Sequence, residues 1–311
     1  MKKNNFKENT SKFNVLRKLK EYRNKFIHYF LKSLSMNECY KIGDQKYNLV
    51  HKEYDDPLFK TNVYELLETD ENNCEKILSE TELETKFKEI NFCTFRGEHN
   101  FSMIELLQKN NFQYVDNFFV VQTNKNEFKP IKNKISVKIE VILGEPSENQ
   151  KKEILKIQKN VYDHSTFQTD LRINPDISSE RSCLRVKSFF NNIDHLIFLA
   201  RDTKNKEKIV GFLQFILSKP DVECENGAVI SDSQGFLYGP VLYSYAFNYI
   251  FEKYVDVDTI FAGCGLTNNK VLRLFQKLNF KIVHKEVHFR KIDLNNDVVS
   301  SKNQYSCRCG N

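Results

Sequence analysis

Hydrophobic positions recur along the chain with two periods that alternate. Spacings of three and four residues predict helices, and alternation or short apolar runs predict strands. We expect helices at Glu82–Glu89, Phe101–Lys109, Glu148–Tyr162, Glu180–Asn191, Pro240–Lys253 and Asn268–Leu278, and strands at Asn62–Glu68, Phe92–Arg96, Phe118–Gln122, Ile135–Leu143, His195–Ala200, Lys208–Leu217, Gly227–Ile230, Thr259–Ala262 and Phe280–Lys291. Such mixing predicts an α/β (α+β) fold, with mixed central sheets flanked by helices.

The element order restarts after a polar run at Asn124–Asn133, which contains Pro130 and is typical of a linker. The segment Gln108–Val115 also resembles Gln276–Val283 at a constant offset of 168 residues. In both, a predicted helix ends at an Asn, which tolerates the left-handed conformation that terminates helices. We therefore expect two related halves, residues 35–126 and 134–292, followed by a polar tail, residues 293–311.

The N-terminal segment concentrates the basic charge. Residues 1–32 carry ten lysines and arginines and two glutamates, a net charge of +8. The whole chain has a net charge of +6, so the remaining residues have a net charge of −2. Apolar residues at helical spacing predict an amphipathic N-terminal helix over Lys12–Leu34, and we treat residues 1–34 as a leader. A helix docked on the body with a solvated basic face is the favoured interpretation. Contact with an anionic membrane or with nucleic acid is the alternative.

Composition excludes several classes of protein. The 311 residues are 40% hydrophobic and 28% charged, which is typical of a globular chain. No apolar window is long enough for a membrane span, and no signal peptide pattern is present. Eight cysteines at irregular spacings indicate reduced thiols in a cytoplasmic protein, and no zinc-site spacing occurs, so we expect no metal.

The segment Ala228–Leu242 has the pattern of an anion site. An apolar strand runs into a turn that bears Gly235 and Gly239, and an amphipathic helix follows, with Pro240 predicted as its first residue. Backbone N–H groups at such a helix start suit a pyrophosphate. A tight strand-to-helix turn without a ligand explains the same residues.

Two motifs then resemble the GNAT superfamily of N-acetyltransferases. Gln234-Gly235-x-x-x-Gly239 is similar to that superfamily's acyl-CoA pyrophosphate loop, and the stretch from Asn268 to Phe280 is similar to its second motif. The resemblance implies two GNAT-like halves, with acetyl-CoA as co-substrate in the C-terminal one. The residues that it places at acetyl-CoA are Val229, Ile230, Gln234, Gly235, Phe236, Leu237, Tyr238, Gly239 and Asn268. Leu237 departs from the motif, where the family has a glycine.

Three upstream segments resemble dTDP-fucosamine acetyltransferases in particular. Tyr54–Tyr64 is similar to the opening of that family, Phe92–Arg96 to a strand that ends in Arg, and His164–Asp170 to a Ser-Arg-Phe-His-x-Asp segment. The resemblance implies acetyl transfer to the amine of a nucleotide-linked 4-amino-4,6-dideoxy sugar, as in surface polysaccharide synthesis. It places Arg96, Ser165, Phe167 and Asp170 at this substrate, while Thr166 and Gln168 depart from the pattern.

The expected chemistry has one gap. An N–H near Val229 or Ile230 would stabilise the thioester oxyanion, but Phe275 stands where the family has the Tyr that protonates the CoA thiolate. Tyr238, His284 and His288 are candidate substitutes, each with a structural role as the simpler explanation. Without a donor, an unassisted thiolate leaves more slowly.

Alternative functions follow from these departures. One is a non-catalytic CoA-binding module with the same fold, and another is an aminoacyl- or other amine acyltransferase. As partners we expect a nucleotide sugar. A second copy of the chain and a peripheral membrane contact through residues 1–34 stay open, and nucleic acid is not expected.

Overall fold

The protein is represented by a computed structural model that describes residues 38–69, 76–131, 137–161, 165–190, 195–204, 208–230 and 235–294. The predicted leader helix, the predicted tail beyond Leu294 and Gln234 of the predicted phosphate loop lie outside these ranges. Within them, no helix combines the length and apolar character needed to cross a membrane.

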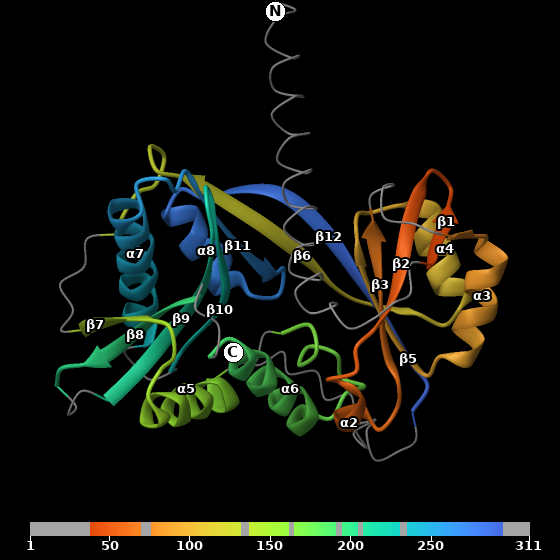
Figure 1. Cartoon of the computed structure of the whole chain (residues 1–311), viewed down its shortest axis with the longest axis horizontal. Coiled ribbons are helices and arrows are strands. Elements are labelled where there is room, and N and C mark those ends of the chain that lie inside the picture. Colours follow the sequence, from red (N-terminus) through yellow and green to blue (C-terminus); the bar gives the residue numbers. More distant parts are fainter. Residues whose placement is uncertain are drawn as a thin grey trace, which may run out of the picture. The chain divides into compact units, whose positions relative to one another are not determined.

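Helices and strands alternate through the described ranges (Figure 1). In chain order they are β1 (Glu38–Ile42), β2 (Gln45–His51), α2 (Asp56–Phe59), β3 (Val63–Thr69), β4 (Lys76–Leu78), α3 (Glu80–Glu89), β5 (Phe92–Gly97), α4 (Phe101–Lys109), β6 (Gln113–Asn124), β7 (Val137–Leu143), α5 (Glu148–Val161), α6 (Pro175–Ser188), β8 (His195–Asp202), β9 (Lys208–Ser218), β10 (Asp221–Val229), α7 (Gly235–Lys253), β11 (Thr259–Gly265), α8 (Asn269–Lys277) and β12 (Lys281–Ile292). The predicted mixed α/β class is confirmed.

The described residues form two compact units, and the chain passes between them inside strands. One unit runs to Asn117 and resumes at Val283, and the other runs from Phe118 to Ile282. This division follows the packing of the chain, and its boundaries differ from the predicted domain boundaries, which stay a prediction. We refer to the two as unit 1 and unit 2.

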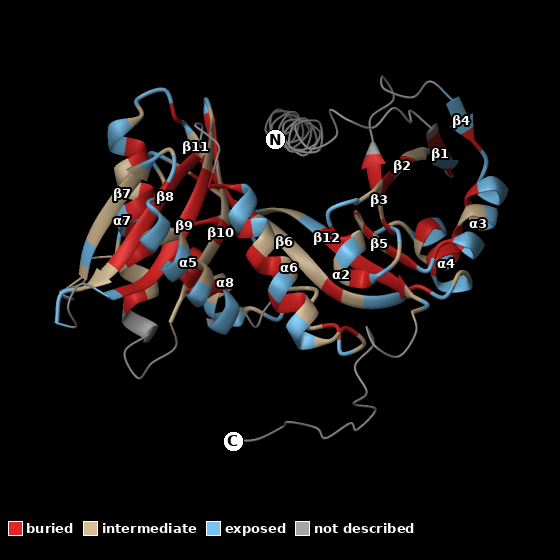
Figure 2. Ribbon diagram, turned by 60° about the horizontal axis from the view of Figure 1, so that its bottom comes forward, coloured by how far each residue is buried: buried red, intermediate tan, exposed pale blue. Residues whose placement is uncertain are grey.

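Unit 2 is built on a mixed sheet with strand order β6-β11-β10-β9-β8-β7. The β10–β11 pair is parallel, and the other neighbours that the unit contains are antiparallel. Strand β8 is buried over His195–Ala200, whereas edge strand β7 is half-buried to exposed (Figure 2). An apolar run in an internal strand is expected, because both of its faces are covered.

Each face of this sheet packs against its own pair of helices (Figure 1). Helices α7 and α8 share a core with inward residues such as Leu213 and Cys264. Helices α5 and α6 cover the opposite face, where Phe212 and Ala228 are buried. Alternate residues of one strand therefore enter two different cores, as the period of a strand requires.

Unit 1 has strand order β4-β1-β2-β3-β5-β12. Helices α3 and α4 pack on one face, around a core that includes Leu83, Phe87, Phe95 and Leu107. Helix α3 begins with a capping box, in which Ser79 and Glu82 bond each other's backbone N–H groups. The hairpin β1–β2, helix α2 and strand β4 were not predicted from the hydrophobic pattern.

The predicted internal repeat is confirmed at the level of local structure. Helices α4 and α8 begin at Asn100 and Asn268, 168 residues apart, and each Asn side chain accepts the N–H of the third residue on. Both helices are followed by an Asn with positive φ, 64° at Asn111 and 65° at Asn279. The next residue then donates its N–H to a carbonyl five residues back, at 2.9 Å in both cases. This is the Schellman termination that the Asn predicted.

The two repeats exchange their last strands. Strand β6 follows α4 but pairs with β11 in unit 2, and β12 follows α8 but pairs with β5 in unit 1. Both pairs are antiparallel. In each pair, the strand that precedes one of the repeated helices, α4 or α8, is joined to the strand that follows the other helix. The repeat therefore explains why the chain changes unit within β6 and again within β12.

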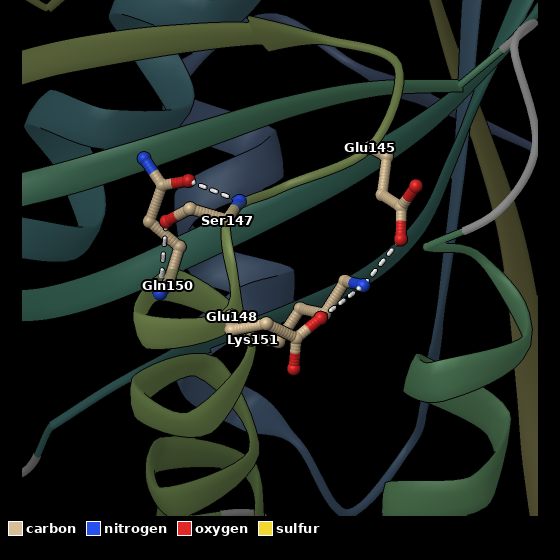
Figure 3. A network of polar contacts seen from close by, with 5 residues as sticks. All are labelled: Glu145, Ser147, Glu148, Gln150 and Lys151. Carbon is tan, nitrogen blue, oxygen red and sulfur yellow. Dashed lines mark hydrogen bonds and ion pairs between the residues drawn. The ribbon is translucent and has the colours of Figure 1, made fainter.

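Helix α5 shows how local sequence sets a boundary (Figure 3). Ser147 and Gln150 form a reciprocal cap, with Ser147 N–H donated to Gln150 Oε1 at 2.7 Å and Gln150 N–H donated to Ser147 Oγ at 3.4 Å. Lys151 then pairs with Glu145 and, at 2.8 Å, with Glu148. These ion pairs are exposed and add little stability, so the cap is the feature that fixes the helix start.

Two predictions are wrong in detail. Helix α7 begins at Gly235, so Pro240 lies inside the helix and not at its first position. The carbonyl four residues earlier loses its intrahelical donor there, which a helix tolerates near its start better than at its centre. Cys39 is disulfide-bonded, contrary to the expected set of reduced thiols, while Cys93, Cys183, Cys224 and Cys264 are free.

Candidate active site

Strands β10 and β11 separate partway along their length. They pair in parallel from Asp221–Thr259 to Cys224–Ala262. Beyond that point β10 continues alone against β9, from Asn226 to Val229, and β11 continues alone against β6 to Gly265. We call this place the β10–β11 split. Within the split, β10 and β11 no longer pair with each other, so each presents a strand edge to the other. Such edges bind extended molecules through backbone groups.

A β-bulge lies at the start of the split. The register between β10 and β9 shifts between Cys224 and Asn226, so Glu225 is the extra residue. Bulges bend and twist a strand, which accounts for the divergence of β10 from β11 here. The Glu225 carboxylate is 6% exposed and accepts a 2.7 Å hydrogen bond from Arg185 of α6. An acidic group is therefore held at the bulge by a cation on the α5–α6 face.

The hydrogen-bond pattern fixes which N–H groups of β10 point into the split. Ile230 donates its N–H to the Val210 carbonyl of β9 at 2.8 Å. Hydrogen-bonded and non-hydrogen-bonded pairs alternate in an antiparallel ladder. The N–H groups of Gly227 and Val229 therefore point away from β9, toward the side where β11 has diverged. Of the two residues predicted near the thioester oxyanion, Val229 has this orientation and Ile230 does not.

Gly227 makes room for a hydroxyl beside this edge. A Cβ built on Gly227 would overlap Leu213 Cδ2 and would lie 2.9 Å from the hydroxyl oxygen of Tyr243 on α7. The Tyr243 side chain is 8% exposed, and its ring packs edge-on against Phe275 with centroids 5.8 Å apart. A buried phenol therefore stands directly over the backbone of β10 within the split.

Phe275, which the sequence resemblance sets at the position of a catalytic Tyr, is a core residue. It is 2% exposed, and besides Tyr243 its ring contacts Phe280 at 5.1 Å. The residue has no group that exchanges a proton, so it acts by packing alone.

The predicted phosphate loop is described only in part. Gly235, Phe236 and Leu237 belong to the first turn of α7, and nothing is described of their side chains. A Cβ on Gly239 would meet nothing within 4 Å, so the space beside this part of the helix is open.

Two further predicted residues have structural partners. Tyr238 is 3% exposed and donates its hydroxyl to Asp202 Oδ2 at 3.2 Å. Asn268 caps α8 by accepting the Val271 N–H at 3.3 Å. The cap explains an Asn at this position without any ligand.

The predicted acceptor residues of unit 2 belong to the segment that joins α5 to α6. Ser165 Oγ accepts the Gln168 N–H at 3.1 Å. The Arg181 guanidinium lies 3.7 Å from the centroid of the Phe167 ring. Asp170 is 6% exposed and binds Arg172 through both oxygens at 2.9 Å.

The fourth predicted acceptor residue, Arg96, belongs to a charged cluster of unit 1. Arg96 donates its Nε–H to Glu286, a carboxylate that is 3% exposed at its side chain. His284 lies 3.4 Å from the same carboxylate, and His288 lies 3.8 Å from it. Burial lowers the pKa of His288; the neighbouring Glu286 carboxylate opposes this shift, and the positive charge of Arg96 reinforces it. His288, predicted as a proton donor, is therefore held toward its neutral form.

No group of three or more His, Cys, Asp and Glu residues suited to a metal ion occurs in the described ranges.

Sequence reasoning missed two residues of the split. Gly227 was recoverable, because an isolated Gly inside a strand pattern marks a bulge or a close approach. Tyr243 gave no signal of its own, since an aromatic residue at helical spacing is ordinary core. Its position over Gly227 depends on how α7 packs on the sheet.

Comparison with solved structures identifies the fold. A GCN5-related N-acetyltransferase from Sphaerobacter thermophilus aligns with a TM-score of 0.53 at 12% identity, over 81% of this chain and 78% of its own. One from Kribbella flavida aligns with a TM-score of 0.51 at 13% identity, over 81% and 88%. A glucosamine N-acetyltransferase region of a fungal multi-domain GH3 β-N-acetylglucosaminidase aligns with a TM-score of 0.50 at 9% identity, over 80% and 31%. No protein-family model matches the sequence, and no curated protein is significantly similar to it. The chain thus has the fold of GCN5-related N-acetyltransferases.

Proposed function

We propose that the protein is an acyl-CoA-dependent N-acyltransferase that binds the pantetheine arm of acetyl-CoA along the open edge of β10. The observation that carries the proposal is the β10–β11 split, with the N–H groups of Gly227 and Val229 directed into it. An extended amide chain matches a strand edge, because both present donors and acceptors at regular intervals. The first turn of α7, which begins at Gly235, would then supply N–H groups for the pyrophosphate.

The residues of the split suit acyl transfer from a thioester. A backbone N–H directed at the thioester oxygen stabilises the negative charge that develops as an amine attacks. Gly227 is the better placed of the two donors, since it lies nearer the bulge and beneath a hydroxyl. Holding amine and thioester side by side lowers the barrier further by proximity.

For the acceptor we propose the amine of a nucleotide-linked amino-deoxy sugar. The support is the sequence resemblance of Phe92–Arg96 and His164–Asp170. A glucosamine N-acetyltransferase region with the same fold provides a precedent for an amino-sugar acceptor.

Calorimetry with the full chain tests the donor site. Acetyl-CoA is expected to bind with one-site stoichiometry, and 3′-dephospho-CoA and free pantetheine separate the contributions of nucleotide and arm. The matched variants are Val229→Pro and Ile230→Pro. The first removes an N–H that points into the split and keeps the ladder to β9, whereas the second removes the N–H donated to Val210. We expect weaker acetyl-CoA binding in the first and lower stability in the second. Absence of binding at millimolar acetyl-CoA contradicts the proposal.

A turnover assay then distinguishes catalysis from binding alone. Phe275 favours the alternative of a CoA-binding module without activity, because it removes the usual proton donor. Release of the CoA thiol is followed with a panel of amino-sugar nucleotides, free amino sugars and aminoacyl acceptors. Binding without thiol release from any acceptor supports the module.

A further inference from the structure

The packing of α7 supplies a hydroxyl where Phe275 lacks one. Tyr243 and Phe275 come from neighbouring helices on the same face of the unit 2 sheet, and their rings meet edge to face at 83°. A Tyr at position 275 and the Tyr at position 243 would both lie in this aromatic contact. In this contact α7 contributes a phenol and α8 contributes a ring without a hydroxyl.

The hydroxyl of Tyr243 lies beside the part of β10 along which the thioester is proposed to bind. Its oxygen is 2.9 Å from the Cβ position of Gly227. The phenol of α7 and the backbone of β10 at Gly227 are therefore direct neighbours.

Glycine at position 227 is needed for this arrangement. Any side chain there would displace the Tyr243 hydroxyl and overlap buried Leu213. The same Gly227 directs its N–H into the split. One residue thus places an N–H donor in the plane of the sheet and a phenol above it, side by side.

We propose that Tyr243 is the proton donor to the departing CoA thiolate, an inference that rests on the function proposed above. The amine nitrogen forms a bond to the carbonyl carbon, the C–S bond breaks, and its electron pair goes to sulfur. The phenol O–H proton passes to that sulfur and yields the CoA thiol. The proton lost by the amine returns through solvent to the phenolate, so the step balances with the amide and the thiol as products.

The other candidate proton donors lie next to acidic side chains. Tyr238 donates its hydroxyl to Asp202. His284 and His288 belong to unit 1, where Glu286 lies close to both imidazoles.

The central variant is Tyr243→Phe, with Tyr249→Phe as the matched control on the same helix, where the Tyr249 ring packs against Phe198 at 5.5 Å. Tyr243→Phe should lower kcat by about 10²-fold or more, the usual contribution of proton donation. Acetyl-CoA affinity measured by calorimetry should not change. The double variant Tyr243→Phe/Phe275→Tyr returns a hydroxyl from α8 and should recover part of the rate.

Two readouts separate proton donation from packing. With an aryl thioester, whose thiol has a low pKa and leaves without a proton, the loss in Tyr243→Phe should shrink. In protein labelled with ¹³Cζ-tyrosine, the resonance assigned to Tyr243 by its absence from the variant should shift when CoA is added, and that of Tyr249 should not.

The outcomes are distinct for the two proposals. Equal kcat in the wild type and Tyr243→Phe, or the same loss with alkyl and aryl thioesters, overturns the assignment of Tyr243 and leaves the acyltransferase proposal standing. No acetyl-CoA binding and no thiol release by the wild type overturn both.

Discussion

The split requires a glycine at position 227, and the substitution Gly227→Ala measures how strictly. The new methyl group would overlap Leu213 Cδ2, lie 2.9 Å from the Tyr243 hydroxyl oxygen and lie 3.4 Å from the Phe212 carbonyl oxygen. Leu213 is 0% exposed, so its methyl group cannot move aside into solvent. Overpacking a buried site in this way costs about 1–3 kcal/mol of unfolding free energy.

The matched control is Gly239→Ala, the same chemical change on α7. A Cβ at Gly239 would meet nothing within 4 Å, and its φ is not in the left-handed region. Alanine is therefore expected to stabilise the helix by about 0.5–1 kcal/mol. The two variants should shift stability in opposite directions, which no general effect of an added methyl group produces.

Urea denaturation followed by circular dichroism measures both changes, with a common slope as the check that the unfolded states are comparable. Gly227→Ala should also reduce thiol release, because it displaces Tyr243. If Gly227→Ala is as stable as the wild type, the described contacts of the split are wrong. If Gly239→Ala lowers acetyl-CoA affinity while it raises stability, Gly239 lies against the ligand.

Further predictions concern residues away from the split. Asn111→Gly should be at least as stable as the wild type, and Asn111→Ala should lose about 1 kcal/mol in urea denaturation, because φ is 64° there. Equal stabilities would contradict this. Asp170→Asn should cost about 3 kcal/mol, because it breaks a mostly buried ion pair with Arg172; a small change in stability with a large change in KM for the acceptor would instead indicate substrate contact. The pKa of His288 is lower in the folded protein than its ordinary value of 6.5, so the unfolded chain binds a proton more readily. The stability that the neutral His288 provides is therefore present above pH 6.5 and is lost as the pH falls through the folded pKa. Melting temperatures from pH 7.5 to 5 should fall more steeply in the wild type than in His288→Gln, and parallel curves would refute the assignment.

The helices and strands with strong periodicity could be predicted from the sequence. Helix α4 was predicted at its observed bounds and β5, β9 and α8 to within one residue, because apolar spacing and terminal Asn residues mark them. Hairpin β1–β2 was missed, since its polar and half-buried residues give weak alternation. The start of α7 was predicted five residues too late, because Pro240 marks a first turn in most helices but lies in the second turn here.

The site could be predicted as a region and not as a set of side chains. The strand, turn and helix at Ala228–Leu242 indicated where an anion would bind. Which N–H groups of β10 point outward depends on its register against β9, and the position of the Tyr243 hydroxyl depends on helix packing. Neither is a local property. Asp170 and Asn268 were predicted from the sequence resemblance, and both take part in local hydrogen bonds of the protein itself.

Amide hydrogen exchange resolved at single residues of β10 tests the central claim most directly. Ile230 donates its N–H to Val210 and should exchange slowly with or without ligand. The N–H groups of Gly227 and Val229 point into the split, so they should exchange faster than Ile230 in the protein alone and slow markedly with saturating acetyl-CoA. Unchanged exchange at Gly227 and Val229 under saturating acetyl-CoA would contradict binding of the acyl donor along β10.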